Sequence, residues 1–266
     1  MVDIDNKIPD INTYLYFTVW TVIYAVIVYN VGSSDPNDTS ASKQSFIWGI
    51  AYFCVLMLGM YYGNVAITQK TCQVPQIKTA ILVTVVPWVL VFMVMALMLM
   101  VFPGWLTPFS NTIGYLFAKL SGVDDVLKRI LAEKYDNPSI KDTDPAIVST
   151  INQIYSNKSL LVNQITEDNF LGFWNKMKDA GLFKEMGDDE KSLQSKLYQI
   201  VRLKNIIAKL CWALLTGGFT TSISKSYISD VECKLSVEEM EERRNKFNEQ
   251  NANIQAENKR VMSNSG

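Results

Sequence analysis

The sequence of 266 residues contains no histidine. Because histidine is the commonest general base, proton shuttle and metal ligand, its absence lowers the expectation of catalysis and of a metal site. The sequence also lacks a Cys-x-x-Cys pair, a glycine-rich phosphate loop, a nucleophile elbow and a His-Glu-x-x-His pattern. We therefore expect no enzymatic activity and no cofactor, and we identify no small-molecule substrate.

An excess of positive charge is also missing, since the formal net charge is −1. Residues 119–205 contain thirteen basic and thirteen acidic residues, and residues 224–266 contain seven basic and eight acidic ones. A protein that binds nucleic acid neutralises phosphates with clustered lysine and arginine. The balanced charge therefore argues against nucleic acid as a partner and against a polybasic patch for anionic lipids.

Charge of either sign is scarce in the N-terminal part of the chain. Residues 1–118 contain four basic and five acidic residues, and residues 79–118 contain no charged residue. About 20 consecutive apolar residues in a helix cross the ~30 Å hydrocarbon core of a bilayer. A buried helix of a large soluble domain is the alternative, but two more long uncharged runs precede this one. The pattern therefore favours a membrane protein.

Four stretches have the length and apolarity of membrane spans: 11–31, 45–67, 79–102 and 206–223. The first is interpreted as a retained span, because no basic segment precedes it as in a signal peptide. Pro87 predicts a kink in the third. The fourth has the weakest signal, and an amphipathic helix lying on the membrane surface is its alternative.

The predicted fold class is all-α, an integral membrane protein with about four transmembrane helices. We divide the chain into a three-span region, a helical solvent-exposed module, a fourth span and a polar helical tail, at residues 1–118, 119–205, 206–223 and 224–266. Capping residues predict module helices that begin near Val123, Asp144, Thr166 and Asp188. A module of this size can bury only a modest core.

Pro103, Gly104 and Trp105 end the third predicted span, because proline cannot donate its amide and glycine is conformationally permissive. The segment that follows, residues 109–120, is too short to cross a bilayer. We expect it in the membrane interface or as a shallow re-entrant piece. A boundary turn anchored by tryptophan is favoured over the alternatives of a pore loop or a substrate-binding break.

Lys209 is the charged residue inside the fourth predicted span. A lysine at the centre of a span costs about 2.5–3.5 kcal/mol on insertion scales. Lys209 lies about one turn inside the span, so we expect its ammonium to reach the head-groups alongside Arg202 and Lys204. An intramembrane charge on an ion pathway is the functional alternative.

The tail carries one apolar residue every seven positions, namely Met240, Phe247, Ile254 and Val261. The companion positions Arg244, Asn251 and Asn258 are polar, so the stripe is too thin for a self-sufficient coiled coil. We predict that the stripe contacts a partner surface, and a solvated helix is the alternative.

Four spans place both termini and the loop between the second and third spans on one face. Cys72 and Cys233 share that face, so a disulfide between them is possible, and free thiols are expected if the compartment is reducing. The glycosylation sequons at Asn37 and Asn157 lie on the other face. Basic residues that flank the spans are balanced between the faces and favour neither orientation.

Three segments in this order resemble multispan membrane proteins of nucleocytoplasmic large DNA viruses, especially those of algae and protists. They are residues 103–115 (PGWLTPFSNTIGY), 159–170 (SLLVNQITEDNF) and 212–224 (WALLTGGFTTSIS). Phe173-Trp174, Tyr227-Ile228 and Cys233 accompany them, so the resemblance covers about 79–233. It implies a virion protein of the inner membrane beneath an icosahedral capsid, where minor capsid proteins join shell and bilayer. No catalytic motif comes with it.

The leading hypothesis is therefore a structural, membrane-anchored minor capsid protein. It would link the viral inner membrane, derived from host endomembranes, to the capsid shell or to neighbouring membrane proteins. The rival hypothesis is a small channel or transporter that uses Pro87, the Pro103-Gly104 break and Lys209. A membrane enzyme is the third class considered.

Overall fold

The computed structural model describes residues 12–38, 40–131, 158–230, 233 and 237–264. These residues form helices and no strand, apart from a single bridge between Leu131 and Phe183. The elements are α1 (Thr13–Val31), α2 (Ser40–Cys72), α3 (Ile77–Pro87), η1 (Trp88–Met93), α4 (Val94–Val101), η2 (Pro103–Leu106), α5 (Thr107–Phe109), η3 (Ser110–Gly114), α6 (Tyr115–Leu120), α7 (Val123–Ile130), α9 (Lys158–Gln164), α10 (Phe170–Asp179), η5 (Gly187–Asp189), α11 (Glu190–Ser229) and α12 (Val237–Asn264).

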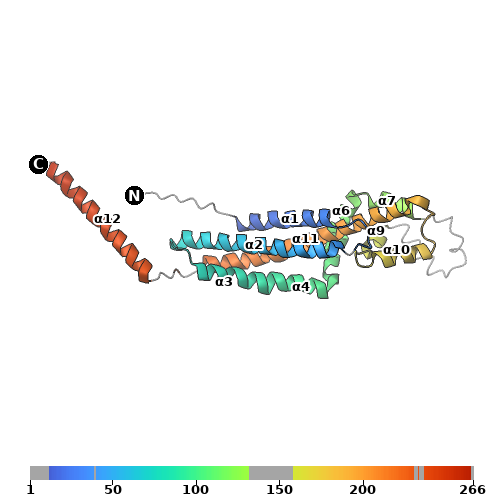
Figure 1. Cartoon of the computed structure of the whole chain (residues 1–266), viewed down its shortest axis with the longest axis horizontal. Coiled ribbons are helices and arrows are strands. Elements are labelled where there is room, and N and C mark those ends of the chain that lie inside the picture. The colour runs from blue at the N-terminus through green and yellow to red at the C-terminus, as the bar shows by residue number, and fades with distance from the viewer. Residues whose placement is uncertain (1–11, 39, 132–157, 231–232, 234–236, 265–266) are drawn as a thin grey trace.

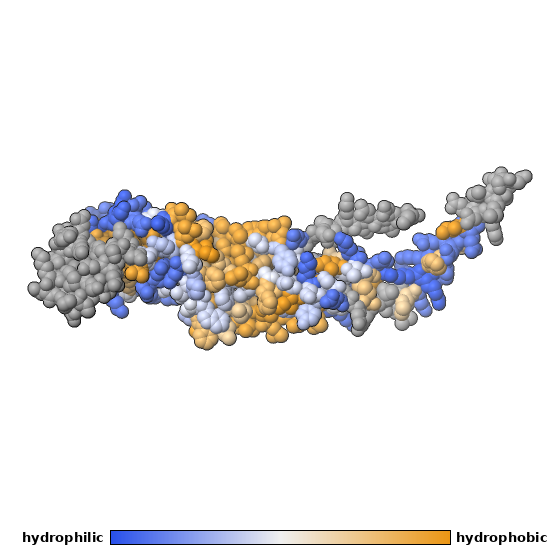
Figure 2. Space-filling view, turned by 180° about the vertical axis from the view of Figure 1, so that it is seen from behind, coloured by the Kyte–Doolittle hydropathy of each residue, from blue (hydrophilic) through white to orange (hydrophobic). Residues whose placement is uncertain are grey.

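Four helical stretches are long and apolar enough to cross a membrane: Thr13–Val31, Lys43–Cys72, Ile77–Val101 and a window within Gly187–Ser229. This confirms the all-helical prediction with four candidate spans. The four run side by side with alternating direction (Figure 1). We call the end with the α2–α3 turn and the C-terminus of α11 the tail end. The opposite end, with residues 103–131 and 158–205, is called the module end. Figure 2 shows an apolar belt between hydrophilic ends.

Helix α11 belongs to both halves of the molecule. Its 40 residues rise about 60 Å, roughly twice the thickness of a hydrocarbon core. Its N-terminal part therefore projects from the belt into the module, and its C-terminal part packs among α1, α2 and α3. The boundary predicted between residues 205 and 206 lies inside this one continuous helix.

The bundle interior is aromatic and closely packed. Its buried residues are Phe17, Leu56, Met60, Trp88 and Phe92, and the ring centroids of Trp88 lie 5.8 Å from Phe17 and 5.0 Å from Phe92. Small residues let the helix backbones approach closely enough for this packing, as is usual between helices in lipid.

Gly59 lies against the Tyr16 ring and Gly217 against the Phe17 ring, so a methyl group at either glycine would overlap a ring. Gly218 has an open space where a methyl group would be added. Of these two adjacent glycines, only Gly217 is in close contact with another helix.

Polar contacts join three of the helices near Pro87. Proline has no amide hydrogen for the carbonyl four residues earlier, which belongs to Val83. The hydroxyl of Ser224 in α11 donates to that carbonyl at 3.0 Å, and the Asn64 amide in α2 donates to Ser224 Oγ at 3.0 Å and to Thr84 Oγ1 at 2.8 Å. The helix continues beyond Pro87 through the wider π-helical turn of η1.

The module has its own hydrophobic core. Residues of α6, α7, α9, α10 and the start of α11 form it, including the buried Leu127, Ile165, Trp174 and Leu197. The helix expected from Thr166 begins at Phe170 and ends in a Schellman motif, in which Leu182 N–H donates to Met177 O at 3.0 Å and Gly181 takes a φ of 67°. The helix expected at Asp144 lies outside the described residues.

Two adjacent glycines of α11 offer a matched test of the bundle packing. We expect Gly217→Ala to lower the thermal unfolding midpoint in detergent and the free energy of unfolding by about 1–3 kcal/mol. The added methyl group would overlap the Phe17 ring, which is itself buried. Gly218→Ala gains the same helix propensity without the overlap, so its midpoint should stay the same or rise. Equal midpoints for the two variants would contradict the packing described here.

Candidate functional site

The residues selected from the sequence fall in two separate regions. Pro103, Gly104, Trp105 and Lys209 lie at the module end, whereas Cys72, Cys233 and the stripe of α12 lie at or beyond the tail end (Figure 1). The structure does not bring the two sets together. Each end is therefore described as a separate candidate contact region.

Arg202 of α11 holds the C-terminus of α1 at the module end. Its guanidinium donates to Ser33 O and Val28 O, each at 2.9 Å, and to Tyr29 O, and it lies over the Tyr29 ring. The last carbonyls of a helix have no partner within the helix and carry partial negative charge, which a cation stabilises. Gly32 leaves the room that the guanidinium occupies.

Lys204 makes the corresponding contact on another side of α11. The residue is 1% exposed, and its ammonium donates to Val162 O at 2.7 Å and to Ile165 O at 2.9 Å, where α9 ends. On the same side the backbone of Gly114 approaches the Lys204 carbonyl so closely that a Cβ would overlap it. Thus α11 fixes α1, η3 and α9 within one turn of its length.

The expectation that Arg202 and Lys204 reach the head-groups is wrong. Both side chains are buried, because backbone carbonyls of other elements accept their hydrogen bonds. Lys209 has a largely exposed side chain, and its ammonium lies 3.9 Å from the Glu167 carboxylate of the module. Glu167 also accepts a hydrogen bond from the Asn205 amide.

The Pro-Gly-Trp segment forms the end of the third candidate span. That helix stops at Val101, Pro103 starts a 3-10 turn, and the elements to α6 cross the module end of the bundle (Figure 1). Trp105 stacks on Phe102 at 5.6 Å and contacts Trp212 of α11 at 5.7 Å between centroids. The outer face of the segment is apolar and exposed, at Trp105, Ile113, Leu116, Phe117 and Leu120.

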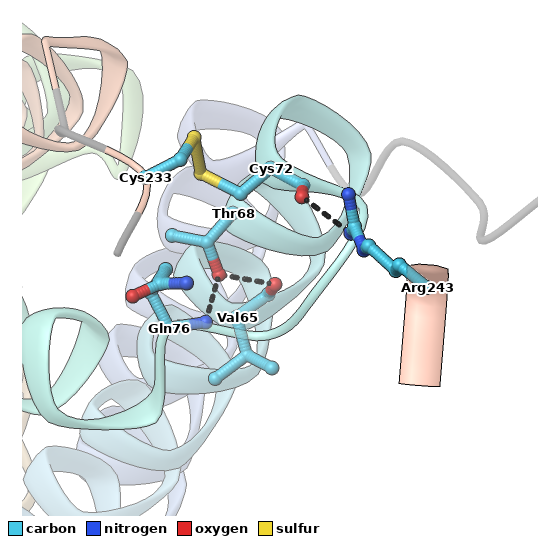
Figure 3. The surroundings of a disulfide bond; sticks show 6 residues. All are labelled: Val65, Thr68, Cys72, Gln76, Cys233 and Arg243. Carbon is cyan, nitrogen blue, oxygen red and sulfur yellow. Dashed lines mark hydrogen bonds between the residues drawn. A yellow bond between two sulfur atoms is a disulfide. The ribbon is translucent and has the colours of Figure 1, made fainter. Parts of the chain in front are cut away.

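A disulfide joins Cys72, the last residue of α2, to Cys233, which follows α11 (Figure 3). Arg243 of α12 donates to the Cys72 carbonyl at 3.2 Å. The α2–α3 turn beside it is closed by Thr68, whose hydroxyl donates to Val65 O at 2.8 Å and accepts from the backbone N–H of Gln76 at 3.1 Å. The bridge therefore ties the tail to the bundle.

The stripe of α12 is exposed along its described side chains. Met240, Phe247 and Ile254 are 49%, 63% and 55% exposed. Val261 belongs to the same helix, but its side chain lies outside the described part. Figure 1 shows α12 extending away from the bundle, so no described part of the chain covers the described stripe.

Sequence reasoning missed the roles of Arg202, Lys204 and Asn64. A signal existed for the first two, because both cations flank Leu203 within the apolar period of a helix. No group of three or more Cys, Asp or Glu side chains in the described ranges could hold a metal ion. The arrangement at both ends is one of helix capping, cross-linking and exposed apolar surface.

One family model, described as triosephosphate isomerase, matches residues 192–265, little more than a quarter of the chain. Most of α11 and all of α12 lie there, and the described residues of this stretch form two helices, whereas a (β/α)₈ barrel requires eight parallel strands. The match therefore shows no family for this chain. No curated protein and no solved structure matches it.

Replacing Arg202 should destabilise the junction of α1 and α11. We expect Arg202→Met to lower the free energy of unfolding by roughly 2–4 kcal/mol, because three carbonyls lose a charged donor. The measurement is the unfolding midpoint in detergent, which should fall. Lys209→Met is the control, since its side chain is 57% exposed and its ammonium lies 3.9 Å from Glu167, and ion pairs at the surface contribute about 0–1 kcal/mol. A larger loss for Lys209→Met would contradict the assignment.

The disulfide should contribute strongly to stability, because it closes a loop with a sequence separation of 161 residues. Because the bridge reduces the entropy of the unfolded chain, it should stabilise the folded state by roughly 5 kcal/mol for a loop of this length. We expect Cys233→Ser, or reduction of the wild type, to lower the unfolding midpoint. Cys54→Ser removes a free cysteine of α2 and should leave the midpoint unchanged. The expectation fails if reduction has no effect on a sample whose bridge was verified by mass spectrometry.

Proposed function

We propose that this chain is an integral membrane protein of structural function, a minor capsid protein that links a viral inner membrane to the capsid shell or to neighbouring membrane proteins. One observation carries the structural role. The apolar belt is closed by aromatic packing and, apart from Arg202 and Lys204 at its module end, holds no buried Lys, Arg, Asp or Glu side chain among the described residues. A folded module and an exposed helix project from its two ends.

The observed geometry supports adhesion rather than transport. Within the bundle, Phe17, Trp88 and Phe92 fill the space between the helices, and Asn64, Thr84 and Ser224 bond to one another or to Val83. Lys209, on which a channel would depend, is exposed and lies near Glu167 outside the bundle core. Lipid burial would supply the anchorage, and the module and α12 would supply specific contacts.

The resemblance of residues 79–233 to membrane proteins of large DNA viruses supports the virion as the location. Under this proposal the membrane is the inner one, derived from host endomembranes, and the partners are lipid, capsid proteins and other virion membrane proteins. The exposed residues Met240, Phe247 and Ile254 are the proposed contact row of the tail.

Fractionation of virions tests the proposal. We expect the chain to stay with the membrane in carbonate and high-salt washes, to require detergent for extraction, and to crosslink to capsid components. Crosslinks from α12 to neighbouring virion membrane proteins should fall when Phe247→Asp is introduced into the exposed row, and should be unaffected by Asn248→Asp on a neighbouring face of α12. Release by carbonate would overturn the membrane anchor, and virions without the chain would overturn the location.

A reconstitution assay separates this proposal from the channel. Liposomes that contain the purified chain should show no ion flux above that of protein-free liposomes. A flux that Lys209→Ala abolishes would instead establish the channel function.

A further inference from the structure

The four cysteines of the chain are distributed unequally along the molecule. Cys72 and Cys233 are bonded to each other at the tail end, and Cys54 and Cys211 lie in the apolar stretches of α2 and α11 as free thiols. Residues 103–205, which include the module, contain no cysteine.

The two ends are also stabilised by different means. The module encloses a continuous apolar core, which includes the fully buried Phe170, Ile165 and Leu197. At the tail end, Cys233 and α12 are joined to the bundle by the disulfide and by the bond from Arg243 to the Cys72 carbonyl. Stabilisation by a core suits any compartment, whereas a structural disulfide persists in an oxidising one and is rare in the cytosol.

We propose that the tail end faces an oxidising compartment, the lumen of the host secretory membranes, and that the module end faces the reducing cytosol. This orientation depends on the membrane insertion proposed above. In the bonding step, Cys72 and Cys233 give up two thiol protons and two electrons to the disulfide of a thiol oxidoreductase, which leaves as a dithiol.

The orientation determines the modification of an exposed sequon. Asn37 lies in the loop between α1 and α2, at the module end, where its backbone amide donates to Asp35 Oδ1 at 2.9 Å. N-linked glycans are added in the lumen, and the disulfide and this loop lie at opposite ends of the bundle. Asn37 therefore stays unmodified. The module end meets the partners that assemble in the cytosol, and α12 meets luminal ones.

Glycan mapping of the full chain made in the presence of microsomes tests the orientation. The substitution Asn253→Thr creates a sequon whose acceptor is Asn251 in α12, beyond the end of α11 at Ser229. We expect this variant to gain one glycan that an endoglycosidase removes, and Asn251→Gln in the same chain to abolish it. The wild type should carry no glycan, and Asn37→Gln combined with Asn157→Gln should leave its mobility unchanged.

Protease digestion of intact microsomes gives the second measurement. An antibody against α12 should detect a protected fragment, and the module should be digested. A glycan on the wild type that Asn37→Gln or Asn157→Gln removes, or digestion of α12 in intact microsomes, would overturn the orientation. Release of the chain by carbonate in the same experiment would show instead that membrane insertion itself had failed.

Discussion

The arrangement of the molecule depends on one turn of α11, in which Arg202 and Lys204 point to different sides and bind the carbonyl ends of α1 and α9. Each helix C-terminus carries a partial negative charge and several unpaired acceptors. In a bundle with few charged groups, these ends would be costly to bury. The two buried cations donate hydrogen bonds to the carbonyls at these ends and thereby fix the angle at which the module meets the bundle.

A second constraint operates within the apolar belt, because a buried backbone carbonyl needs a hydrogen-bond partner. Pro87 releases the carbonyl of Val83, and a hydroxyl from a different helix replaces the missing amide. Because Ser224 also accepts from Asn64, this single defect connects α2, α3 and α11. The polar residues thus specify which helices are neighbours, a choice that apolar side chains alone would leave unspecified in lipid.

The four apolar helices and the break at Pro103 could be predicted from sequence. Both depend on short segments alone, since apolarity over about 20 residues and the missing N–H of a proline can be read locally. The contacts of Arg202 and Lys204 could not be predicted in this way. Their acceptors are backbone carbonyls separated by up to 174 residues, and any residue type supplies such a carbonyl. The pairing of Cys72 with Cys233 was an open alternative, since topology placed the two cysteines on one face without giving their distance. The tail stripe was visible as a period of seven, yet a period indicates a face of a helix and not what covers it.

The two ends show how a small protein divides stability between burial and covalent linkage. The module has enough residues to enclose a core around Trp174 and Leu197, so its shape follows from apolar burial. Helix α12 is polar apart from one narrow row and has no comparable surface to bury. Its position is instead set close to Cys72 by a covalent bond and by one hydrogen bond from Arg243. A helix attached in this way keeps its exposed row free for a partner, which a helix packed against the bundle could not do.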